Sequence, residues 1–505
     1  MFWGCLPCGV HWLDEPIVDT TVTEPDPGLI NADFKPIARQ DRNFGVWDLA
    51  ALWIGLVVSN TTWYLAGSLV ELGFSWWQGI LTVVLGNLIT LVPLVLNAQP
   101  GTKYGIPFPV LARASFGIRG AMLPSLMRAC VACGWFGIMT WVGSAAIHEL
   151  LNRLAGPLST AAIPWLGISP SQAACFAGFW LFQVGIIVQG MDAIRTVERW
   201  CAPVLLAFSA ALLMWAYHAT GGHFGSMLSA PSQFGAGMPK EGKFLSSFFP
   251  ALTANVGYWA TLSLNISDFT RHAVSQRAQV LGQALGLPLC MAAFSFTGLA
   301  VTSATPAIFG RVISDPVELL SQLQHPLAVA AGLLGLVLAS LSTNIAANIV
   351  APANAIVNIS PSRISFRSAA LVTCLLGAAV MPWKLIASTQ GFIFTWLIGY
   401  SALLGPIAGV LIADYWLCKR RHLDVNALYS SLPTRPYWYQ GGWNMAAVKA
   451  VILGILPSLP GFLATVGLVK RVPPLANQLY QFAWFVGFGT ALLSYCSMMS
   501  NAEGA

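Results

Sequence analysis

Twelve runs of about twenty predominantly apolar residues follow one another along the chain, and each is long enough to cross a lipid bilayer as a helix. Only 9% of the 505 residues carry a charge, against roughly 25% in soluble proteins. This composition excludes a cytosolic enzyme, a disordered protein and a disulfide-stapled secreted domain. The sequence therefore predicts an all-α integral membrane protein with twelve transmembrane helices. The predicted spans are 44–70, 77–97, 121–148, 161–189, 200–219, 245–265, 280–303, 327–352, 368–383, 389–413, 444–466 and 476–498.

The distribution of positive charges between these spans predicts how the chain is oriented. With the N-terminus in the cytoplasm, the loops on that side hold sixteen Lys and Arg residues and the loops on the other side hold seven. Cytoplasmic loops are the ones enriched in Lys and Arg, so we expect both termini in the cytoplasm and the chain in a plasma or inner membrane. The net charge of +6 is too small and too dispersed to predict a nucleic-acid partner. The polar stretch before the first span is not expected to be a cleaved signal peptide, and its first thirteen residues are expected to be a disordered tail.

The first and the sixth span carry polar residues and glycine near their middle. The first contains Ser59-Asn60-Thr61-Thr62, whose side chains compete for backbone groups and favour local unwinding. In the sixth, Gly257 permits a break and the following Tyr258-Trp259 offers rings for stacking. Each of these spans opens a five-span unit, and interrupted helices at corresponding places point to a transporter binding site. Taken alone, the same residues are equally typical of polar and aromatic contacts between packed helices.

The eighth and the third span each present a candidate binding face. Asn344 and Asn348 are four residues apart and share one helix face, beside the hydroxyls of Ser342 and Thr343. Buried amides need a ligand, a neighbour or water, and such oxygens suit a hard cation such as Na⁺ without selecting it. In the third span, Trp135 and Met139 share a face that is either a packed aromatic surface or a stacking wall for a flat ligand. Small residues around Ala346 in the eighth span leave simple helix packing as the alternative there.

Several long stretches together resemble one family, the nucleobase–cation symporter 1 family, which carries purines, pyrimidines, allantoin, hydantoins and some vitamins. The resemblance implies a fold of five plus five inverted-repeat helices, with helices 1 and 6 broken and two further helices at the C-terminus. The corresponding segments are a tail over 1–43, repeats over 44–219 and 245–413, the last two spans over 444–498, and a tail over 499–505. The matching stretches are Asn31–Pro36, Gln99–Gly120, Gly134–Trp141, Asn265–Arg271, Ser342–Asn348 and Gly405–Trp416.

Carried over residue by residue, the resemblance implies a substrate pocket and a cation site. Trp135 and Trp259 match the two rings that sandwich a planar heterocycle, and Asn348, with Asn344 before it, matches the amides that read ring N–H and C=O groups. The family's Na⁺ site maps to the carbonyls of Gly55, Val58 and Ala339 and to the hydroxyls of Ser342 and Thr343. Both hydroxyls are present, which favours Na⁺, although many eukaryotic relatives are described as proton-coupled. No cofactor besides the coupling ion is implied.

Three positions differ from the family pattern, so the substrate of a relative cannot be copied. Met139 stands where many relatives have Gln or Glu, and its thioether is only a weak acceptor. Ser59 and Tyr258 stand where the hydantoin-carrying relative has Gln and Gly. The prediction is a secondary-active importer of a nucleobase such as uracil, or of allantoin or a hydantoin, coupled to a cation that is more readily Na⁺.

The alternatives are a proton-coupled transporter of a pyridoxine-like or thiamine-like vitamin, a passive channel, and, more remotely, an intramembrane enzyme. An enzyme is disfavoured because neither a Gly-x-Ser-x-Gly nor a His-Glu-x-x-His motif occurs in the sequence. A channel is disfavoured because interrupted helices and stacking residues suit an occluded site better than an open pore.

Overall fold

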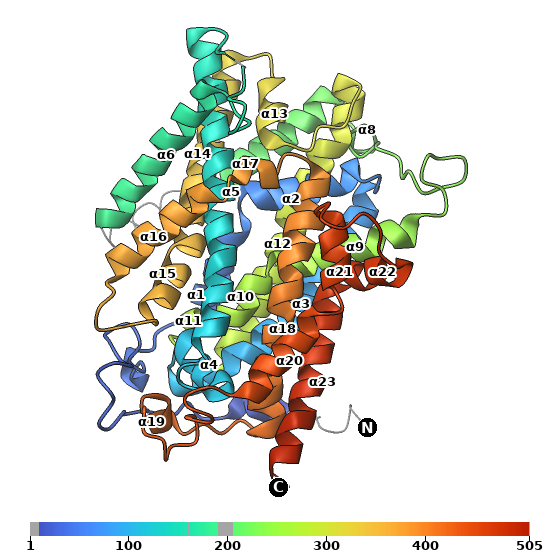
Figure 1. The fold of residues 1–505 in the computed structure, drawn as a ribbon. Helices are drawn as coiled ribbons and strands as arrows, with labels where there is room; N and C mark the ends of the chain where they lie inside the picture. The colour runs from blue at the N-terminus through green and yellow to red at the C-terminus, as the bar shows by residue number, and fades with distance from the viewer. Residues whose placement is uncertain (1–9, 160, 190–205, 504–505) are drawn as a thin grey trace.

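The computed structural model describes residues 10–159, 161–189 and 206–503, and within these ranges the chain is helical and contains no β-sheet. Residues 10–43 and the end of the last helix lie at the same end of the bundle (Figure 1). The longer elements are α1 Val46–Val57, α2 Asn60–Glu71, α3 Trp76–Tyr104, α4 Phe108–Phe116, α5 Met122–Ala155, α6 Pro170–Gln189, α9 Phe244–Tyr258, α10 Ala260–Asn265, α12 Gln276–Phe309, α14 Pro326–Asn348, α15 Val350–Val357, α16 Phe366–Ala379, α18 Ile398–Ile412, α20 Met445–Ile455, α21 Leu459–Thr465, α22 Pro474–Gln481 and α23 Ala483–Glu503.

Short helical turns join these elements, and two π-helical segments flank α18. A further helix, Leu206–Ala219, precedes α8 and matches the described part of the predicted fifth span; residues 200–205 of that prediction lie outside the described ranges. The short elements are η2 Val10–Asp14, η3 Arg39–Asp41, α8 Phe224–Met227, α11 Ser267–Thr270, α13 Pro316–Ser321, α17 Pro382–Leu385, η4 Gly391–Leu397, η5 Ala413–Cys418 and α19 Val425–Leu428.

The number of spans in the described residues is smaller than the sequence predicts by length and composition alone. Six continuous helices are long and apolar enough to cross a membrane, and three bent pairs raise the number to nine. The bent pairs are α1 with α2, α20 with α21, and α22 with α23, at 62°, 48° and 87°. The predicted sixth and ninth spans correspond to α9 with α10 and to α16, which are shorter. The all-helical membrane fold is as predicted, whereas the count of twelve is not reached by this criterion.

Two predicted spans extend beyond the helices in the structure, past a start signal in one case and a stop signal in the other. The predicted span 161–189 starts nine residues too early, since α6 begins at Pro170. Ser169 forms the cap there: its backbone N–H donates to Gln172 Oε1 and its hydroxyl accepts from the Gln172 N–H, at 2.9 and 3.2 Å. The predicted span 368–383 ends early, at Ala379, because Met381 adopts a left-handed φ of 51° immediately before Pro382.

The N-terminal segment packs against the bundle instead of forming a free tail. The rings of Trp12 and Trp416 meet edge to face at 5.5 Å, and the Glu15 carboxylate pairs with Lys103, at 3.2 Å, and with Arg421. The Arg42 guanidinium donates to the Thr102 carbonyl at 2.6 Å, and burial lowers the pKa of this guanidinium. The expectation of a disordered tail is therefore wrong for residues 10–13, while residues 1–9 lie outside the described ranges.

Close packing between α5 and α16 holds the wall on which the candidate site is built. A Cβ atom at Gly137 would lie 2.2 Å from the Gly377 carbonyl oxygen, and one at Gly377 would lie 2.7 Å from Phe136 Cδ1. Small residues at such crossings let helix backbones approach, which is how membrane helices gain van der Waals contact. This contact fixes the part of α5 that carries Trp135 and Met139.

We expect Gly137→Ala to destabilise the protein, because the added methyl group meets a backbone carbonyl that cannot move without shifting α16. Overpacking of this kind costs about 1–3 kcal/mol, which should lower the midpoint of thermal unfolding of the purified protein in detergent. Gly178→Ala on α6 is the matched control, since its Cβ would meet nothing within 4 Å and alanine favours helix. Equal unfolding midpoints for the two variants would contradict the proposed contact.

Candidate functional site

The first predicted break lies where the hydroxyl run placed it. The helix α1 ends at Val57, α2 begins at Asn60, and the two meet at 62°. Ser59 caps α2, because its hydroxyl accepts from the Thr62 N–H at 3.3 Å. Asn60 donates to the Leu336 carbonyl at 2.9 Å and to the Ser340 hydroxyl at 2.8 Å, which ties the break to α14.

The second break lies two residues after the predicted one, and one residue separates its two helices, against two residues at the first break. The helix α9 ends at Tyr258 and α10 begins at Ala260, so the interruption is Trp259 itself, with φ −102° and ψ 6°. Gly257 is needed for packing: a Cβ there would lie 2.1 Å from the Ser401 hydroxyl. The Gly257 carbonyl accepts from the Tyr400 hydroxyl at 2.8 Å, so this backbone group at the break has a partner.

A cavity of about 40 Å³ lies where these breaks face α5 and α14. A second, smaller cavity is lined by Val58, Ser59, Asn60 and Ala339. Among the described residues, Gly55, Ser342 and Asn344 line neither of these two cavities. The predicted site residues that line the first cavity are Trp135, Met139, Tyr258, Trp259, Thr343 and Asn348. The structure thus brings site residues from three predicted spans to one place, and Leu56 and Thr61 of the first span line the same cavity.

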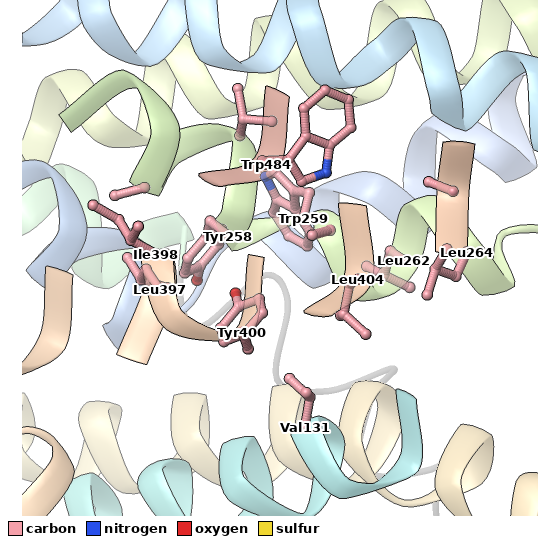
Figure 2. Close-up of a cluster of buried hydrophobic side chains, with 14 of the residues drawn as sticks. Val131, Tyr258, Trp259, Leu262, Leu264, Leu397, Ile398, Tyr400, Leu404 and Trp484 are labelled. Atoms are coloured by element: carbon pink, nitrogen blue, oxygen red, sulfur yellow. The ribbon is translucent and has the colours of Figure 1, made fainter. Parts of the chain in front are cut away.

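Tyr258 packs edge to face against both candidate stacking rings. Its ring centroid lies 5.4 Å from that of Trp135 and 4.9 Å from that of Trp259, with interplanar angles of 85° and 87°. Figure 2 shows Tyr258 beside Trp259. The Tyr258 hydroxyl is bonded to the Thr61 hydroxyl at 2.8 Å and to the Thr62 hydroxyl at 3.0 Å. These contacts join the break in the sixth span to the break in the first.

A relay of three buried amides fixes which group Asn348 offers to the cavity. Asn344 donates to Gln183 Oε1 at 2.8 Å and to the Phe136 carbonyl at 3.1 Å, so its Oδ1 is left to accept. Asn348 donates to that Oδ1 at 3.1 Å. Its own Oδ1 accepts no hydrogen bond from any residue in the described ranges and is available to a ligand. Asn344 therefore positions Asn348 from behind. Gln183 was not singled out from the sequence, because a lone amide in the fourth span carries no pattern.

Arg128 is a cavity-lining residue that the sequence analysis did not propose. It is 2% exposed, and its Nε donates to Asn265 Oδ1 at 3.1 Å. Asn265 in turn donates to the Asp268 carboxylate at 3.1 Å, so an amide stands between the two charges. The Arg128 Nη1 has no hydrogen-bond partner among the described residues. The sequence does contain a signal for Arg128, because it is a single positive charge within the apolar run 121–148. A charged side chain inside a membrane span is costly and usually has a function.

Two of the candidate cation residues, Val58 and Ala339, meet where the end of α1 packs on α14. Val58 and Ala339 pack together with Ile54 and Phe294. Thr343 Oγ1 is buried and has no hydrogen-bond partner in the described part of the chain. The last carbonyls of a helix also lack partners within it, so the end of α1 supplies acceptors. Carbonyl and hydroxyl oxygens are ligands that suit a hard monovalent cation, and an unpaired buried hydroxyl fits that use.

Comparison with known proteins identifies this architecture. A family described as permeases for cytosine and purines, uracil, thiamine and allantoin matches residues 36–487. A purine-uracil permease of Arabidopsis thaliana is 50% identical over 477 residues, which cover 94% of this chain and 78% of the relative. The allantoin permease of Bacillus subtilis is 37% identical over 477 residues, covering 93% of each chain.

Solved structures share the fold. Mhp1 in an inward-facing conformation matches with a TM-score of 0.76 and 24% identity, covering 95% of this chain and 96% of Mhp1. Mhp1 in a closed conformation with bromovinylhydantoin bound matches with a TM-score of 0.72 and 24% identity, covering 94% and 96%. The predicted fold class is thereby confirmed. The relatives are permeases, so the protein is a transporter in a membrane and not an enzyme. The chain belongs to the nucleobase–cation symporter 1 family.

Proposed function

We propose that the protein is a secondary-active importer of a planar nitrogen heterocycle, such as uracil, allantoin or a hydantoin, and that it works by alternating access. The observation that carries this proposal is the shared cavity: Trp135, Trp259 and Asn348 line it from three different spans. Indole rings bind flat heterocycles by stacking, and the Asn348 carbonyl can accept from a ring N–H. The relatives named as purine-uracil and allantoin permeases support the same class of substrate.

We further propose that a cation, preferentially Na⁺, binds between the end of α1 and α14. Its ligands are the carbonyls of Gly55, Val58 and Ala339 and the hydroxyls of Ser342 and Thr343. The unpaired buried hydroxyl of Thr343 and the packing of Val58 on Ala339 support this assignment. A cation can drive uptake only if it binds one conformation better than the other.

The proposed orientation places residues 10–43 and the end of α23 in the cytoplasm. Both lie at one end of the bundle (Figure 1), and the Lys and Arg residues of the loops are concentrated on the same side. Within the membrane, we assign 44–219 and 245–413 to the two repeats and 444–498 to the additional helices, because the two breaks lie near the start of each repeat.

The first prediction concerns the heterocycle. Asn348→Ala should abolish uptake of radiolabelled substrate into proteoliposomes, and Trp259→Ala should raise KM about 5- to 150-fold, since stacking of a base on an aromatic ring is worth about 1–3 kcal/mol. The matched controls are Asn354→Ala on α15 and Trp165→Ala, whose ring is 70% exposed. Wild-type uptake by Asn348→Ala would refute the pocket. A wild-type protein that only equilibrates substrate, without accumulation, would indicate a channel.

The second prediction concerns the cation. Replacing external Na⁺ by choline should reduce uptake at least tenfold, and Thr343→Val should raise the Na⁺ concentration for half-maximal uptake, because the methyl group removes one ligand. Thr373→Val is the control, since its hydroxyl donates to the Ala369 carbonyl, at 3.0 Å, within α16, and Thr373 lines neither of the two cavities described above. Uptake that depends on external pH and not on Na⁺ would favour proton coupling, and with it the alternative of a proton-coupled vitamin transporter.

A further inference from the structure

The cavity between the breaks is narrow, and Tyr258 is one of the side chains that narrow it. The cavity has a volume of about 40 Å³, and Trp135, Tyr258, Trp259 and Asn348 all line it. Tyr258 is 7% exposed and contacts the rings of both Trp135 and Trp259. The phenol therefore already makes an edge-to-face contact with each of the two indoles on which a flat ring would stack.

The hydroxyl of Tyr258 is held as firmly as its ring. It lies 2.8 Å from the Thr61 hydroxyl, 3.0 Å from that of Thr62 and 3.4 Å from that of Ser59. Ser59 also bonds to Thr62, at 2.9 Å, so these hydroxyls have partners even without the phenol. Displacing Tyr258 breaks its own bonds and leaves the hydroxyls of the first break partnered among themselves.

We propose that Tyr258 is a specificity-determining residue whose phenol competes with the substrate for contact with the two indoles. This inference rests on the proposed function. A ligand must replace what the phenol supplies: a flat ring against the two indoles and a polar edge toward the hydroxyls of the first break. The ligand also needs a second polar edge, with an N–H group that donates to Asn348 Oδ1. The class is thus a small planar heterocycle with polar groups on two edges. A bulky ring substituent is excluded, since it needs the volume into which the displaced phenol must move.

This role predicts the sign of two substitutions. The apparent Kd equals the intrinsic Kd divided by the fraction of protein that is competent to bind. If the phenol lowers that fraction, then weakening the hydrogen bonds that hold the phenol should raise the fraction and lower the apparent Kd. Tyr258→Phe keeps the ring and loses the hydroxyl bonds, so Kd for small heterocycles should fall about three- to tenfold. Tyr258→Ala removes the ring and should bind a hydantoin with a bulky arm at least tenfold better than wild type does.

The experiment is a direct measurement of Kd for the purified full-length chain in detergent, with uracil, hydantoin, allantoin and bromovinylhydantoin as probes, at saturating Na⁺. Tyr400→Phe is the matched control: it also removes a buried hydroxyl, the one that bonds to the Gly257 carbonyl, and should not raise affinity. A thermal-unfolding midpoint confirms that each variant is folded.

Opposite results separate this inference from the function on which it rests. A higher Kd for Tyr258→Phe with all small probes would show that the hydroxyl touches the substrate and would overturn the inference, while the transport function stands. An unchanged ratio of Kd values for bromovinylhydantoin and hydantoin in Tyr258→Ala would overturn the size limit. Absence of binding of every probe to the wild type and to Tyr258→Ala would overturn both the inference and the proposed function.

Discussion

A lipid bilayer offers no water, so each backbone or polar group freed at a helix break must find its partner inside the protein. The two breaks in this chain satisfy each other. Asn60 at the first break donates to α14, while Thr61 and Thr62 bond to Tyr258 at the second. The Gly257 carbonyl is taken by Tyr400 on α18. The candidate site is the region in which these obligatory polar contacts converge.

The same constraint explains why residues far from the cavity decide what it can bind. Asn344 lies behind the cavity wall, and its amide is committed to Gln183 and Phe136. That commitment turns its Oδ1 toward Asn348, whose Nδ2 is thereby used, and leaves a carbonyl for the ligand. A fully satisfied buried network is rigid, because any rotation would leave a polar group without a partner. The recognition of an N–H group that we propose for Asn348 would thus depend on Gln183 of α6, through Asn344.

Sequence patterns predicted the features that depend on local chemistry. The run from Ser59 to Thr62 placed the first break, and the spacing of Trp135 and Met139 placed a cavity wall, because helical periodicity fixes which side chains share a face. Features that depend on contacts between distant segments were not predictable. Gly257 serves close packing on α18, and nothing local distinguishes that from a hinge. The cap at Ser169 is a local signal for the start of α6, but the apolar run begins before it and conceals that start.

The proposed cation site and the position of Tyr258 are connected through one short segment. Val58 is assigned to the cation, and the next residues, Ser59, Thr61 and Thr62, hold the phenol. Thr343 lines the first cavity, while Ala339, one turn earlier on α14, lines the second. In this proposal, an ion that orders the segment at Val58 would change how firmly the phenol is anchored, and so the fraction of the protein that can accept a heterocycle. By thermodynamic reciprocity the heterocycle must change the affinity for the ion by the same factor, which is the coupling that a symporter requires.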